Sequence, residues 1–165
     1  MRARDFSRKM KQSNFHIVLV EPEIPQNTGN IVRLCACTSC DLFLVGKLGF
    51  ILDDKRVKRS GLDYWDSVTI HRYDSLEELK EEYKTSNFYY LTTKVEKKYT
   101  DNRFKEGDFL VFGPETRGLD EKLLWENKES CLTIPMAEGQ RSLNLSNSVA
   151  IVVYEAIRQT SCLYR

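Results

Sequence analysis

Short β-rich runs alternate with segments of helical periodicity along most of this chain, and that alternation constrains the fold more than any other feature. We expect strands at 15–20, 42–45, 68–73, 88–92, 109–112 and 131–134, and helices at 31–40, 75–83, 120–125 and 146–159. The sequence Ser75-Leu-Glu-Glu78 is a capping box for the second helix. Thr28 or Asn30 is the expected N-cap of the first helix, and Ser146 or Asn147 that of the last. Strand and helix in alternation predict an α/β fold, a parallel sheet with helices on both faces, whose strand order the pattern leaves open.

Charge and length divide the chain into a short tail and one domain. Of the 165 residues, the first 14 hold five basic residues and one acidic residue, so the tail carries +4 and the remainder −3 of a net +1. Because the tail has no apolar periodicity, we interpret 1–14 as a flexible basic tail, with a short transit peptide as the alternative, and 15–165 as a single domain. No apolar run is long enough for a membrane span or a secretory signal. We therefore expect a cytoplasmic protein with no membrane partner and with its five cysteines reduced.

Four segments that follow predicted strands contain unusual combinations of Gly, Pro, Asn and charged residues. They are 21–33, 92–94, 112–119 and 135–147. In a parallel sheet these segments gather at the carboxyl edge, where ligands bind. Each alone is explained as a set of turn residues, but four at one edge predict a site. The common dinucleotide and phosphate-loop motifs and the nucleophile elbow are missing, and His16 and His71 fall in or beside strands, which favours structural roles.

Cys35, Cys37 and Cys40 raise the question of a metal site. Offsets of two and three residues in a helix cannot bring three sulfur atoms to one face. We therefore expect no metal and interpret the cysteines as small core residues.

Two basic clusters point to a nucleic acid partner. Residues 47–59 and 94–105 each carry a local charge of +3, with aromatic residues nearby. Such clusters suit phosphate contact and base stacking, although solvated loops explain them equally well. The expected RNA contacts are Lys55, Arg56, Lys58, Arg59, Arg117 and Arg141.

The sequences of the four loops resemble the SPOUT class of RNA methyltransferases, in particular the tRNA 2′-O-methyltransferases that modify the wobble cytidine or uridine. The resemblance covers about residues 15–159. It rests on the segments at 21–36 (EPEIPQNTGNIVRLCA), 53–56 (DDKR), 61–64 (GLDY), 112–119 (FGPETRGL) and 141–148 (RSLNLSNS). The resemblance implies a parallel-sheet SPOUT fold with a deep C-terminal trefoil knot, and a homodimer with its pocket near the subunit interface. Its implied partner is the anticodon stem-loop of tRNA.

The resemblance implies that S-adenosyl-L-methionine binds among three loops. The cofactor residues it implies are Leu91, Thr92, Gly113, Glu115, Gly118, Ile134, Met136, Ser142 and Leu143. These residues suit the ligand chemically, because the aliphatic side chains can wall an adenine and the glycines leave room for ribose and methionine.

The catalytic residues that the resemblance implies are Arg33, Asn27, Glu115, Ser142 and Asn144. The reaction moves a methyl group from a sulfonium to a ribose hydroxyl, which requires alignment and proton removal. Arginine stays protonated and is a poor base, so we expect Arg33 to hold the ribose and its phosphate and to stabilise the developing oxyanion. Asn27, Glu115 and Asn144 would orient it, with local capping as the alternative role of the two asparagines.

Three other functions are alternatives. One is 2′-O-methylation at another tRNA position or in rRNA. The second is RNA binding by a relative that has lost catalysis, against which the joint presence of Arg33, Glu115, Ser142 and Asn144 argues. The third is nucleotide binding by an α/β protein of unrelated chemistry, against which the missing phosphate motifs argue.

Overall fold

Six parallel strands form one sheet in the order β3-β2-β1-β5-β4-β6. The computed structural model describes residues 13–52 and 64–163. The strands are β1 (His16–Val20), β2 (Asp41–Val45), β3 (Ile70–Tyr73), β4 (Phe88–Leu91), β5 (Phe109–Phe112) and β6 (Cys131–Leu132). The central strands β1 and β5 are almost wholly apolar and buried, as expected for a parallel sheet covered on both faces.

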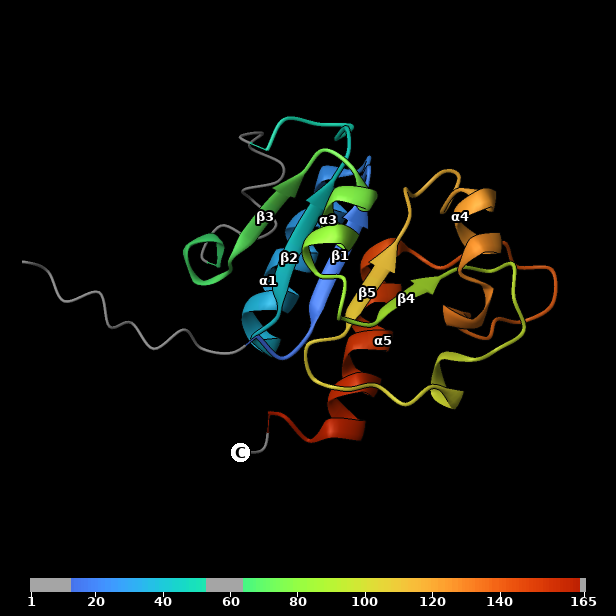
Figure 1. Cartoon of the computed structure of the whole chain (residues 1–165). Helices are drawn as coiled ribbons and strands as arrows, with labels where there is room; N and C mark the ends of the chain where they lie inside the picture. Colours follow the sequence, from blue (N-terminus) through green and yellow to red (C-terminus); the bar gives the residue numbers. More distant parts are fainter. Residues whose placement is uncertain (1–12, 53–63, 164–165) are drawn as a thin grey trace, which may run out of the picture.

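Among the described residues, helices lie on both faces of the sheet (Figure 1). Helices α1 (Pro25–Thr38) and α5 (Leu145–Thr160) share one core cluster, in which Ile31, Val32, Val149 and Val153 are fully buried. Helices α3 (Leu76–Glu82) and α4 (Glu121–Glu126) border the second cluster on the opposite face. Short 3-10 turns lie at Trp65–Ser67, Tyr99–Asp101 and Lys128–Ser130. The parallel α/β architecture predicted from the alternating pattern is therefore confirmed.

The first helix begins six residues earlier than predicted. Its N-cap is Ile24 and Pro25 is its first residue, so Thr28 and Asn30 lie inside the helix and neither is the N-cap. Proline suits this position because its fixed φ matches the helix and its missing N–H would have no intrahelical partner. The search for a capping side chain led to the wrong boundary, because Ile24 has none to offer.

The last helix also begins earlier, at Leu145. The side chain of Asn144 caps it by accepting a hydrogen bond from the N–H of Asn147 at 3.3 Å, so the expected N-caps Ser146 and Asn147 lie in the first turn. The predicted strand at 131–134 ends at Leu132, and Thr133 forms only an isolated bridge with Lys98.

The capping box before α3 is confirmed in its first half. Ser75 Oγ accepts a hydrogen bond from the N–H of Glu78 at 3.2 Å. The carboxylate of Glu78 accepts from the N–H of Asp74, one residue earlier than the standard motif.

His16 and His71 both lie beside the carboxylate of Asp41, at 4.0 and 3.6 Å. His16 packs among the rings of Phe43, Tyr83 and Phe109. Cys35 and Cys40 are buried and Cys37 is exposed, and burial raises the pKa of Cys40 to about 11. Across residues 13–52 and 64–163, no three His, Cys, Asp or Glu side chains are grouped as metal ligands would be. In the same part of the chain, no helix has the length and apolar character required to cross a bilayer.

Candidate functional site

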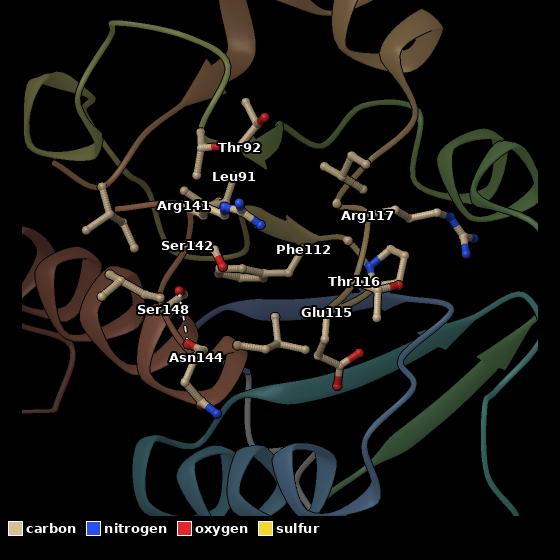
Figure 2. A pocket seen from close by; sticks show the side chains of 18 of the residues that line it. Leu91, Thr92, Phe112, Glu115, Thr116, Arg117, Arg141, Ser142, Asn144 and Ser148 are labelled. Atoms are coloured by element: carbon tan, nitrogen blue, oxygen red, sulfur yellow. Dashed lines mark hydrogen bonds between the residues drawn. The ribbon is translucent and has the colours of Figure 1, made fainter. Parts of the chain in front are cut away.

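A cavity of about 500 Å³ lies at the carboxyl ends of β4, β5 and β6 (Figure 2). Its walls come from the loops that follow these strands, together with the start of α1 and the first turn of α5. These loops are the ones that sequence analysis assigned to one sheet edge, so their gathering is confirmed. The volume lies within the range of roughly 300–1,000 Å³ of small-molecule sites.

All nine residues expected to contact the cofactor line this one cavity. They are Leu91, Thr92, Gly113, Glu115, Gly118, Ile134, Met136, Ser142 and Leu143. The aliphatic members come from the end of β4 (Leu91) and from the loop between β6 and α5 (Ile134 and Leu143), and they offer apolar surface to the cavity. The loops after β4 and β6 are joined where the N–H of Thr92 donates to the carbonyl oxygen of Leu132 at 3.0 Å.

Gly113 allows the loop after β5 to fold back on itself. A Cβ atom at this position would lie 2.4 Å from the carbonyl carbon of Gly118 and from the nitrogen of Leu119. The N–H of Gly118 donates to the carbonyl oxygen of Pro114 at 2.9 Å, and Gly118 has a φ of +70°. A larger residue at either position would change the shape of this wall.

Glu115 directs its carboxylate toward the N-terminus of α1 (Figure 2). Its oxygens accept hydrogen bonds from the N–H groups of Glu23 and Ile24, at 2.8 and 3.0 Å, and from the side-chain amide of Asn27 at 3.2 Å. Because Ile24 has no capping side chain and the first turn has no acidic residue, Glu115 supplies from another loop both the cap and the negative charge that a helix N-terminus favours.

Asn27 and Asn144 extend this network to the last helix. The Nδ2 of Asn144 donates to the Oδ1 of Asn27 at 3.0 Å, and Asn27 is only 4% exposed. The capping role is found for Asn144, which caps α5, whereas neither asparagine has a described hydrogen bond to Arg33, so their orienting role stays a prediction.

Arg33 lies outside the lining of this cavity. It is exposed on α1, and its guanidinium carbon lies 5.3 Å from the centre of the Tyr64 ring, in a cation–π geometry. Of the five expected catalytic residues, the structure thus brings Asn27, Glu115, Ser142 and Asn144 to the cavity and leaves Arg33 apart from them.

The expected RNA contacts divide into three groups. Arg141 lines the cavity and extends toward its interior, whereas Arg117 also lines it but points away (Figure 2). Arg117 pairs with the carboxylate of Glu21 and lies 3.9 Å from that of Glu23. Lys55, Arg56, Lys58 and Arg59 fall outside the described residues.

Two residues of the site were not predicted from the sequence as site residues. Glu23 accepts hydrogen bonds from Thr116 through its carboxylate, and Lys94, which was expected only as part of a basic cluster, lies at the cavity wall. Lys94 forms an ion pair with Glu121 at 2.9 Å. Both residues lie in loops that the sequence singled out, but only the tertiary structure shows what they contact.

Comparison with known proteins agrees with this geometry. The model of the SpoU rRNA Methylase family matches residues 14–154. A tRNA (cytidine(34)-2'-O)-methyltransferase of Saccharophagus degradans is 50% identical over 149 residues, covering 88% of this chain and 95% of the relative.

The descriptions of similar solved structures also name methylation or a methyltransferase. One described as "Structural insights into the 2-OH methylation of C/U34 on tRNA" is 42% identical, with a TM-score of 0.83 and coverage of 88% of this chain and 95% of that one. The SpoU methyltransferase AviRb of Streptomyces viridochromogenes, in complex with AdoMet, is 25% identical with a TM-score of 0.79, covering 96% of this chain and 63% of that one. The family model matches most of the chain, and a relative is 50% identical over 88% of it. The protein therefore belongs to the SpoU rRNA Methylase family.

Proposed function

We propose that this protein transfers a methyl group from S-adenosyl-L-methionine to the ribose 2′-hydroxyl of the wobble nucleotide, cytidine or uridine, in the tRNA anticodon. The observation that carries the proposal is the convergence of nine expected cofactor residues, from three loops, on one cavity. The close relative named for methylation of cytidine 34 and the structure described for C/U34 support the position.

The cavity suits the proposed cofactor. Leu91, Ile134 and Leu143 offer apolar surface to an adenine, and Gly113 and Gly118 bring main chain close to the ligand. When bound, the cofactor supplies a methyl group on a sulfonium sulfur, which is open to attack by an oxygen nucleophile. The AdoMet complex of AviRb supports this assignment.

The residues of this chain would align the ribose and balance its charge. Ser142 faces the cavity and can donate a hydrogen bond to the cofactor or the nucleotide. Arg141 can contact a phosphate at the same cavity. Arg33, which lies outside the cavity lining, would hold the ribose and phosphate of the bound nucleotide and stabilise negative charge on the attacking oxygen. Glu115, Asn27 and Asn144 would fix the helix termini that frame the reaction.

We also infer a homodimer. Ile151 and Tyr154 are exposed on the same face of α5, and Ile24 and Leu143 are exposed beside the cavity. Exposed apolar side chains at these two places favour a protein partner, and a second copy that covered Ile24 and Leu143 would adjoin the cavity. Light scattering is expected to give twice the mass of the chain, and Tyr154→Glu is expected to reduce it to that of one chain.

The knot implied by the resemblance has support in the C-terminal segment. After β6 at the sheet edge, the chain returns to α5, which packs on α1. The side chain of Gln159 on α5 accepts from the N–H of Phe104 and donates to the carbonyl oxygen of Asn102, so the long loop after β4 is fixed to the last helix. A cytoplasmic location stays a prediction.

The test is methyl transfer to defined RNA. Purified protein is incubated with methyl-labelled cofactor and unmodified tRNA transcripts, and the labelled nucleoside is mapped. We expect 2′-O-methylcytidine or 2′-O-methyluridine at position 34, lost when the 2′-hydroxyl there is replaced by hydrogen. Labelling of a base, or of a ribose elsewhere in tRNA, would contradict the proposed target.

The family name favours one second candidate, a ribose in rRNA. Ribosomal RNA fragments in the same assay distinguish it, because transfer to rRNA in preference to tRNA would support this alternative. No transfer to any RNA, with cofactor binding intact, would favour a relative that has lost catalysis.

A further inference from the structure

The segment before α1 and the loop after β5 are joined by reciprocal hydrogen bonds, in which a carboxylate of each accepts from the other. Glu115 of the β5 loop accepts hydrogen bonds from the N–H groups of Glu23 and Ile24. In return, Glu23 accepts from the N–H of Thr116 at 3.0 Å and from its hydroxyl at 2.9 Å. We propose that Glu23 is a positioning residue, which holds the loop 113–118 in its cofactor-binding shape through Thr116. This inference rests on the proposed function and names a residue to which the function has not assigned a role.

Glu23 acts through the loop and does not itself line the cavity. Both of its carboxylate oxygens are used by Thr116, Oε1 by the hydroxyl and Oε2 by the N–H. Thr116 lies between Pro114 and Gly118, inside the narrow turn that Gly113 permits. Two bonds to one residue at the tip of this turn fix its position relative to α1.

The main chain of Glu23 packs against the loop after β2. A Cβ atom on Gly49 would lie 2.8 Å from the Cα of Glu23, so this close approach requires glycine. The N–H of Gly49 donates to the carbonyl oxygen of Pro22 at 2.9 Å. Glu23 is therefore anchored on one side by the loop after β2 and on the other by Glu115, which makes it a fixed support for Thr116.

The neighbouring ion pair of Arg117 with Glu21 is a weaker candidate for this role. The side chain of Arg117 is 60% exposed, and exposed ion pairs contribute little because water screens them. Thr116 is also exposed, but its two bonds to Glu23 are charge-assisted, one of them comes from the main chain, and the Glu23 side chain is 29% exposed. The position of the loop should therefore depend on Thr116 and Glu23 more than on Arg117.

The test compares Glu23→Ala and Thr116→Val, with Thr116→Ser as the conservative variant that keeps the hydroxyl. Glu81→Ala is the matched control, because Glu81 is exposed on α3 and pairs only with Lys84 among the described residues. Calorimetry measures the Kd for S-adenosyl-L-methionine. Steady-state kinetics with tRNA as the methyl acceptor give the KM for the cofactor and the kcat, and thermal unfolding gives the Tm of each variant.

We expect Glu23→Ala and Thr116→Val each to raise the Kd and the KM for the cofactor about tenfold, as loss of a charge-assisted hydrogen bond would. The kcat at saturating cofactor should change by less than about threefold, because the reacting residues stay in place. Thr116→Ser and Glu81→Ala should bind like the unaltered protein. The double variant should bind no more weakly than Glu23→Ala alone, because the hydroxyl bond that Thr116→Val removes is already absent when Glu23 is replaced.

Three outcomes would overturn the inference. An unchanged Kd in Glu23→Ala would show that the loop does not need this support. A fall in kcat with an unchanged KM and a lowered Tm would show a purely structural role. Additive effects in the double variant would show that Glu23 acts through another residue. Failure of the unaltered protein to bind the cofactor would instead contradict the proposed function.

Discussion

The side chain of Asn144 donates a hydrogen bond to that of Asn27 across 3.0 Å, which joins two residues 117 positions apart in the sequence. Asn27 lies in the first turn of α1, and Asn144 is the N-cap of α5. Through Glu115, which accepts from Asn27, the same network reaches the loop after β5. The cavity is thus framed by two helix N-termini whose relative position is set by amide and carboxylate groups.

Replacing Asn144 should separate the two roles of its side chain. Asn144→Asp keeps the oxygen that caps α5 but loses the donor to Asn27, whose buried oxygen is then unsatisfied, and we expect a loss of about 1–3 kcal/mol in unfolding free energy. Asn144→Ala also loses the cap and should cost about 1 kcal/mol more. Urea denaturation measures both. Equal stability of Asn144→Asp and the unaltered protein would show that the bond contributes nothing.

Gly113→Ala should disrupt the cavity wall. The added methyl group would meet main-chain atoms of Gly118 and Leu119 at 2.4 Å, so the loop must open, and we expect a loss of about 1–3 kcal/mol together with weaker cofactor binding. Gly139→Ala is the matched control, because nothing lies within 4 Å of its added Cβ although its φ is +81°. Calorimetric titration with the cofactor should show weaker binding for Gly113→Ala than for Gly139→Ala; equal binding would contradict the role of the narrow turn.

Arg33→Ala is expected to abolish methyl transfer while leaving the Kd for the cofactor within about twofold of the original value. The reason is that Arg33 lies outside the cavity lining and is exposed, so its loss removes charge from the RNA site and little packing. Arg33→Lys should restore only part of the activity, because an ammonium lacks the planar pair of donors. Lost cofactor binding in a folded Arg33→Ala variant would place this residue in the cofactor site instead.

His16 should make the fold less stable at mildly acidic pH. Burial lowers the pKa of His16 below its ordinary value of 6.5, an effect that Asp41 opposes and His71 reinforces. The unfolded chain therefore binds the proton first as the pH falls, so stability is full above 6.5 and decreases from there toward the lowered pKa. His16→Phe, which keeps an aromatic ring among Phe43, Tyr83 and Phe109, should flatten that decrease. Unfolding free energies at pH 7 and pH 5 measure it, and parallel losses in both proteins would assign the effect to other groups.

Local patterns predicted most of the elements but shifted their ends. The strands were predicted from apolar runs such as 15–20 and 109–112. The capping box placed α3 because Ser75 is only three residues from Glu78, whose N–H it accepts from. The predicted start of α1 was wrong because its cap comes from Glu115, about ninety residues away, and no local sequence signal marks the true start. Sequence periodicity cannot locate a helix end whose capping group lies far away in the sequence.

The candidate site was predictable as a set of loops and not as a set of contacts. Parallel strands place their following loops at one edge, so the convergence of residues from Leu91 to Leu143 on one cavity follows from the fold class and the resemblance. The carboxylate of Glu115 turned toward α1, the support of Thr116 by Glu23 and the separation of Arg33 from the cavity depend on tertiary packing.

The sequence by itself determined a parallel α/β fold, the identity of the loops that carry the chemistry and the membership of a methyltransferase class. Those properties follow from periodicity and from motifs, which are local. The tertiary structure alone decided which carboxylate caps α1, which one accepts hydrogen bonds from Thr116, and that Arg33 stands apart from the cavity lining. The contacts join residues that are some ninety positions or more apart in the sequence. Their geometry depends on how the sheet and its two helix layers pack.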